Sequence, residues 1–280
     1  MPEPIRRVKP ITLIVFLFAH FVLTAIVNLV FFAGNTFRPL ASATGGLFTG
    51  SLLANLIFIA VLVLAIILAM GRLRLYDVGL IGRNILPAAG YTFMLWGVAQ
   101  IIHLIAGLLT NGTIMTNPDW TIYGVGFMIG LLLTQIFGNA LFEEIAYRGF
   151  LFPQLYLWLT SLRDTPWKRF AAALLISQVA FALSHIPNRI YLRMTPGDIV
   201  IDLLMLVGWG VLYTLLYLRT DNLFLVVGVH ALGNTPTTLF ATAPVLTGAG
   251  ASMLIYLLAV TATFLYPMLR AQRMDYAEAV

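Results

Sequence analysis

Two adjacent glutamates and an arginine form the first group of side chains that could do chemistry. Glu143 and Glu144 stand side by side in an apolar run, and Arg148 follows Glu144 by four residues. Residues four apart share one face of a helix, so Glu144 and Arg148 can form an ion pair. Glu143 points about a quarter-turn away and keeps a free carboxylate, which is the group that a general base needs.

Two histidines form the second and third groups, and each has a partner four residues away. Phe181 precedes His185, and Asn234 follows His230. In each pair the two side chains would project from the same face of a helix. An imidazole can position or move a proton, and imidazole and amide N–H groups can stabilise an oxyanion. Together with Glu143, these residues form three groups that can accept, donate or hold a proton.

The spacing of the chain predicts which of these groups meet. Position 164 lies in a polar turn, midway in sequence between Glu143 and His185. If both arms are helical, this hairpin returns His185 to the depth of Glu143. The geometry requires the helix that carries Glu143 to continue through about Leu159, past Pro153.

Three other ionisable residues inside apolar runs lack such a pattern. For His20 and His103 a hydrogen bond to a neighbouring helix is the simpler interpretation. Asp202 is the remaining acid, and we expect it to pair with a histidine or to line a cavity.

The composition indicates that these groups lie in a membrane. Hydrophobic residues make up 60% of the chain and charged residues 10%, and the apolar runs have about the 20 residues that a transmembrane helix needs. An ionisable group in hydrocarbon costs about 2.5–3.5 kcal/mol, so each one should face the bundle interior or water. The expected helices lie near 11–32, 48–70, 86–109, 122–147, 170–186, 199–218, 222–241 and 251–269. The prediction is an all-α, polytopic transmembrane helix bundle of about eight spans, with residues 1–280 in a single integral membrane domain.

Charge and cysteine content narrow the possible partners. The net charge of +5 comes from cations in short loops, where they set membrane orientation, so no nucleic-acid partner is expected. Alternation of the spans leaves only Arg38, Arg189 and Arg193 opposite the N-terminal side, which predicts that both termini are cytoplasmic. With no cysteine in the chain, disulfides, thiolate metal sites and cysteine nucleophiles are excluded.

The three motifs, taken in order, resemble those of a known family. E-E-x-x-x-R at Glu143 to Arg148, F-x-x-x-H ending at His185 and H-x-x-x-N starting at His230 are similar to the motif set of the CAAX-protease and bacteriocin-processing family of intramembrane endopeptidases, which includes CAAX prenyl protease 2. The resemblance covers a motif-bearing core of about residues 124–240. The first three spans carry no matching motif.

The resemblance implies a role for each motif residue. Glu143 is expected to be the general base, with His185 positioning the attacking water and His230 and Asn234 stabilising the oxyanion. Glu144, Arg148 and Phe181 would support the site structurally.

The resemblance also implies which partners the protein has and whether it needs a metal ion. It implies membrane lipid and membrane-associated protein or peptide substrates as partners, prenylated CAAX-type proteins among them. No cofactor is expected. The alternative is zinc held by Glu143, His185 and His230, since these are ligand types that zinc uses.

Two other classes of function remain open at this stage. A proton- or ion-coupled transporter would use the same buried ionisable residues as a relay, although no inverted repeat is evident. A non-catalytic immunity or scaffold protein would have lost catalytic positions, and none is substituted here. The sequence gives no indication of oligomeric state.

Overall fold

The computed structural model of the chain describes residues 4–35, 37–159 and 165–265. Within these ranges the chain is helical and contains no β-strand. The turn centred on position 164, and the final residues of the predicted 251–269 helix, lie outside the described residues.

Most helices occupy the predicted apolar runs. α1 (Pro10–Ile26) and α3 (Gly50–Phe58) each continue into a π-helical segment, Val27–Phe32 and Ile59–Met70. The other helices of these runs are α4 (Ile85–Asn111), α6 (Val125–Thr134), the four-residue α7 (Ala140–Glu143), α8 (Phe152–Leu159), α9 (Pro166–Leu183), α11 (Pro196–Thr220), α12 (Leu223–Asn234) and α13 (Ala249–Leu265). Three short helices, α2 (Arg38–Ala43), α5 (Asp119–Ile122) and α10 (Ile186–Tyr191), lie between them.

The prediction of an all-helical, polytopic bundle is confirmed. Six of the described helices are long and apolar enough to cross a membrane, and two further apolar helices, α12 and α13, are shorter. At 12 residues, α12 is about 18 Å long, well short of a hydrocarbon core of about 30 Å.

The predicted helix over 222–241 is wrong at its C-terminal end. α12 ends at Asn234, because Pro236 pushes the residue before it out of the helical region. Thr235 accordingly has φ −140° and ψ 81°. The chain beyond it runs close to the α4–α5 connection, where Asn117 N donates to Leu239 O at 2.9 Å.

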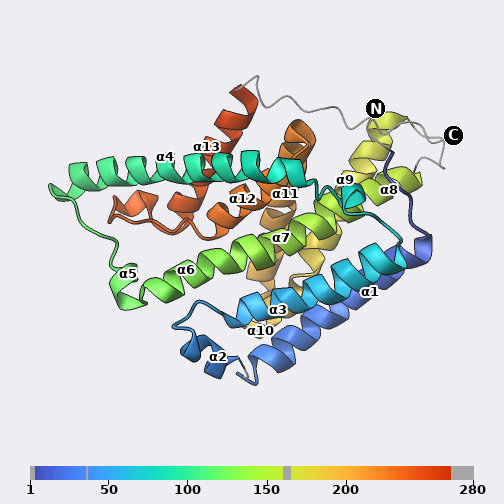
Figure 1. Cartoon of the computed structure of the whole chain (residues 1–280), viewed down its shortest axis with the longest axis horizontal. Helices are drawn as coiled ribbons and strands as arrows, with labels where there is room; N and C mark the ends of the chain where they lie inside the picture. Colours follow the sequence, from blue (N-terminus) through green and yellow to red (C-terminus); the bar gives the residue numbers. More distant parts are fainter. Residues whose placement is uncertain (1–3, 36, 160–164, 266–280) are drawn as a thin grey trace.

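A central rod positions the motifs. α6, α7 and α8 are joined by π-helical segments into one helix, Val125–Leu159, as the hairpin argument required. In Figure 1 this rod runs diagonally through the middle of the molecule, with α3 and α1 on one side and α12 on the other, and α12 and α13 pack on each other. Residues at the middle of the rod can therefore meet side chains from both sides.

The small residues of α6 are used for packing inside the chain. A Cβ atom at Gly126 would collide with the backbone carbonyl of Gly45, and one at Gly130 with that of Gly46. Gly126 and Gly130, which are four residues apart, therefore allow the backbone of α6 to pack closely on another segment of the same chain.

Candidate active site

One cavity of about 580 Å³ brings the predicted catalytic residues together. Glu143, His185, His230 and Asn234 all line it. They come from the central rod, from the start of α10 and from α12, so three separate helical segments meet there. The volume of the cavity lies within the range of ligand-binding clefts.

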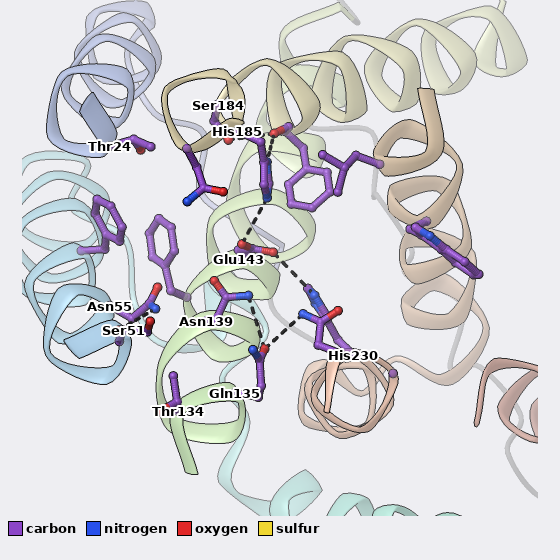
Figure 2. Close-up of a pocket in the computed structure, with 18 of the residues that line it drawn as sticks. Thr24, Ser51, Asn55, Thr134, Gln135, Asn139, Glu143, Ser184, His185 and His230 are labelled. Carbon is purple, nitrogen blue, oxygen red and sulfur yellow. Dashed lines mark hydrogen bonds and ion pairs between the residues drawn. The ribbon is translucent and has the colours of Figure 1, made fainter. Parts of the chain in front are cut away.

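Glu143 lies between two histidine rings, as Figure 2 shows. Its Oε1 is 3.7 Å from His185 Nε2, and its Oε2 is 3.6 Å from His230 Nε2. These separations are too long for direct hydrogen bonds. The carboxylate thus faces the cavity without a direct donor on either oxygen from these two rings.

The other nitrogen of each ring is anchored. His185 Nδ1 is 2.9 Å from Phe181 O, and His230 Nδ1 is 2.7 Å from Glu144 Oε1. A carbonyl and a carboxylate can only accept, so each Nδ1 carries the donating proton. In the neutral form of each histidine, Nε2 is then a bare acceptor directed at Glu143.

His185 owes its position to a break in the helix. α9 ends at Leu183, and α10 begins at Ile186 with Pro187 in its first turn. Proline is favoured there because the first N–H groups of a helix have no partner within it. The turn leaves the His185 ring packed edge-on against Phe181, with ring centroids 4.9 Å apart.

The predicted ion pair between Glu144 and Arg148 is present and fully buried. Arg148 Nη1 is 3.3 Å from Glu144 Oε1, and both side chains have 0% exposure. Arg148 Nη2 also donates to Gln178 Oε1 at 3.2 Å. The guanidinium lies over the rings of Phe181 and Tyr213. Phe181 therefore contacts both the ion pair and the His185 ring.

π-helical segments flank Glu143 on both sides. Gln135–Asn139 precedes α7, and Glu144–Leu151 follows it. Such segments are rare and are often found at functional sites, because they turn side chains away from the register of an α-helix. Glu143 thus lies between two such segments.

Sequence reasoning missed an amide cluster beside Glu143. Asn234 Nδ2 donates to Gln135 Oε1 at 3.1 Å, and Asn139 Nδ2 lies 3.4 Å from the same oxygen. Gln135, Asn139 and Glu143 follow one another at intervals of four residues. That spacing along one helical face was the signal that could have identified them.

His20 was also underestimated. Its Nδ1 lies 2.9 Å from the hydroxyl of Tyr147, which donates to Ser184 Oγ at 3.0 Å. The predicted hydrogen bond to another helix is present, but His20 also lines the cavity. His103 differs, since neither of its ring nitrogens has a hydrogen-bond partner among the described residues.

Asp202 pairs with an arginine, so the expected histidine partner is wrong. Arg189 Nε is 2.7 Å from Asp202 Oδ2. The two residues lie on α10 and α11, which are joined by a short turn, and that proximity could not be deduced from helical spacing.

The described residues do not fit a metal site. No group of three or more histidine, cysteine, aspartate or glutamate side chains among them is arranged to hold a metal ion. Zinc ligation by Glu143, His185 and His230 finds no support in this arrangement. The metal-free reaction stays a prediction for a chelation experiment.

Comparison with known proteins identifies the motif-bearing segment. Residues 124–236 match the family described as Type II CAAX prenyl endopeptidase Rce1-like. No curated protein and no solved structure matches the chain significantly. Together with the six long apolar helices, the match indicates an integral membrane protein. The segment that carries all three motifs thus matches the Rce1-like family of CAAX prenyl endopeptidases, the family that those motifs resemble.

Proposed function

We propose that this protein is an intramembrane endopeptidase that hydrolyses peptide bonds with a water molecule activated by Glu143. The observation that carries the proposal is the position of the Glu143 carboxylate between two anchored histidines in a cavity of about 580 Å³. A general base must reach the nucleophile directly or through one water. The gaps of 3.6 and 3.7 Å between Glu143 and the two Nε2 atoms suit a water that bridges carboxylate and imidazole.

The chemical step needs only these side chains and one water. The water donates one O–H to Glu143 and the other to the bare Nε2 of His185, which directs an oxygen lone pair at the scissile carbonyl. Glu143 takes the proton as the C–O bond forms. It then returns that proton to the leaving amine as the C–N bond breaks, so the base is regenerated.

His230 and Asn234 are proposed to stabilise the oxyanion. Because His230 Nδ1 already donates to Glu144, its Nε2 must carry a second proton to donate to the oxyanion. The Glu144 carboxylate, 2.7 Å from Nδ1, stabilises that positive charge. Asn234 contributes the N–H of its side-chain amide that is not used by Gln135.

The family description guides the substrate class. CAAX prenyl endopeptidases act on prenylated proteins, so we propose membrane-associated, lipid-modified proteins or peptides as substrates. An apolar part of the cavity wall, formed by Phe32, Met205, Leu206 and Trp209 among others, could accept a chain that enters from the lipid.

The proposal is tested with purified protein in lipid vesicles. Lipid-tethered fluorogenic peptides should be cut by the unaltered chain and not by a folded Glu143→Ala variant. No cleavage of any tethered peptide, combined with dissipation of a pH gradient across the same vesicles, would favour a proton transporter instead.

The absence of metal from the reaction is tested in the same assay. Incubation with a strong chelator should leave the rate unchanged. Loss of the rate, recovered when about one zinc per chain is restored, would overturn the metal-free mechanism.

A further inference from the structure

We propose that Arg189 recognises the free C-terminal carboxylate of the substrate, and that a polar stripe on α1 holds the residues between that carboxylate and the scissile bond. The proposal rests on the proposed peptidase function and adds end specificity to the same site. Its residues lie partly outside the segment that matches the family, because α1 precedes residue 124.

Arg189 differs in charge from the other described residues of the cavity wall. Among the described residues that line the cavity, it is the only lysine or arginine, and Glu143 is the only acid. Arg189 lies in α10, one helical turn beyond His185, and its backbone N–H donates to His185 O at 3.1 Å. Arg189 therefore lies one helical turn from His185, whose Nε2 is 3.7 Å from Oε1 of the proposed base Glu143.

The guanidinium is held in one orientation with donors to spare. Its Nε and Nη2 donate to Asp202 at 2.7 and 3.3 Å, and its Nη1 donates to Asn188 Oδ1 at 2.7 Å. A guanidinium has five N–H groups, so one on each Nη has no partner among these contacts. Two N–H groups at the end of a planar fork match the two oxygens of a carboxylate.

A stripe on α1 connects this cation with the catalytic residues. His20, Thr24 and Asn28 lie four residues apart and all line the cavity. At one end His20 reaches Ser184, next to His185, through Tyr147. At the other end Asn28 Oδ1 accepts from Asn188, the neighbour of Arg189, at 2.8 Å. The stripe thus runs from the catalytic centre to the cation.

The stripe contains a hydroxyl group without a partner among the described residues, and the spacing of its side chains suits an extended peptide. Thr24 is 7% exposed, and its hydroxyl has no hydrogen-bond partner among the described residues. Buried polar groups are normally paired, so this hydroxyl is available to bond a group that enters the cavity. Four helical residues rise about 6 Å, close to the roughly 6.6 Å between alternate residues of an extended chain.

The length of the stripe limits the segment that it could hold. His20 and Asn28 are about 12 Å apart along the helix axis, which corresponds to three or four extended residues at about 3.3 Å each. Figure 2 places Thr24 and Ser184 on one side of Glu143 and Gln135 and Thr134 on the other. The part of the substrate after the scissile bond would occupy the first side, and the part before it the second.

A binding measurement tests the proposal independently of hydrolysis. The full-length Glu143→Gln variant in detergent micelles is titrated into fluorescein-labelled Ala-Val-Leu-Ala, as the free acid and as the C-terminal amide, and fluorescence polarisation is recorded. The acid should bind at least about tenfold more tightly, as expected for one charge-assisted recognition pair. Equal affinity for acid and amide would overturn the proposal. Whether the unaltered chain cuts peptides is decided by the separate vesicle assay.

Three further substitutions in that background distinguish recognition from a structural ion pair. Arg189→Gln should bring the acid-to-amide ratio close to one, whereas Asp202→Asn should keep or raise it, because Arg189 loses a competing carboxylate. Arg193→Gln is the charge control, since Arg193 is exposed and four residues further on, and should leave the ratio unchanged. Equal loss in the Arg189 and Asp202 variants would overturn the proposal, as would an unchanged ratio in Arg189→Gln.

A conservative variant covers the case in which Arg189→Gln does not fold. Arg189→Lys keeps the charge but lacks the planar fork, so the ratio should fall to an intermediate value. A ratio equal to that of the unaltered residue would contradict recognition through the fork.

Discussion

Two neighbouring glutamates occupy opposite environments in this protein. Glu143 faces the cavity, and the Nε2 atoms of His230 and His185 are 3.6 and 3.7 Å from its oxygens. Glu144, the next residue, has 0% side-chain exposure and accepts from Arg148 at 3.3 Å and from His230 at 2.7 Å. One carboxylate is open to a ligand, and the other is enclosed in an ion pair.

The difference follows from helix geometry and separates chemistry from structure. Successive residues project about 100° apart on a helix, so one glutamate can reach the cavity while the next points into the bundle. A carboxylate without direct donors keeps its lone pairs for a water proton. A buried and paired carboxylate instead fixes its partners in place, here Arg148 and the His230 ring.

The largest effect on stability is expected from Arg148→Ala. Removal of one partner from a buried ion pair leaves the Glu144 charge uncompensated, which costs about 3–5 kcal/mol. Thermal unfolding in detergent should show an early transition and a low yield of folded protein. A variant that melts like the unaltered chain but does not cleave peptide would assign Arg148 a direct role and break the comparison.

A smaller effect, on the rate, is expected from Asn234→Ala. Loss of one oxyanion donor typically lowers kcat by about 10²-fold. Single-turnover kinetics should show that the chemical step slows more than substrate affinity falls. A change confined to KM would instead assign Asn234 to ground-state binding.

The smallest effect is expected from Gly210→Ala on α11. An added Cβ would collide with Gln178 Oε1 and lie 3.1 Å from Arg148 Nη2. Overpacking of this kind costs about 1–3 kcal/mol, so the melting temperature should fall. Gly208→Ala is the matched control, because nothing lies within 4 Å of its added Cβ. Equal melting temperatures for the two variants would show that the Arg148 environment tolerates the added methyl group.

Periodicity and spacing predicted much of this site. The hairpin argument correctly brought His185 opposite Glu143, because both arms are helical and the rod continues through Leu159. The four-residue spacing correctly paired Glu144 with Arg148. These features depend on one helix or one hairpin, so the sequence contains the information that determines them.

Contacts between distant helices could not be predicted in the same way. The bond between Glu144 and His230 depends on how α12 is rotated against the central rod, and no local pattern encodes that rotation. The same holds for the contacts of Gln135 with Asn234 and of His20 with Tyr147. The single-domain organisation of residues 1–280 and the cytoplasmic location of both termini stay predictions.

The most direct test compares Glu143→Gln with Glu144→Gln in one assay, with the folded fraction of each measured alongside peptide cleavage. The account predicts that the free energy of unfolding of Glu143→Gln lies within about 1 kcal/mol of that of the unaltered chain, because glutamine has the same shape as glutamate. Its cleavage should nevertheless fall by at least about 10²-fold, since the general base is lost. Glu144→Gln should instead lower the free energy of unfolding and the folded fraction, because the buried Arg148 loses its counter-charge. Normal turnover by a well-folded Glu143→Gln variant would contradict the assignment of Glu143 as the base.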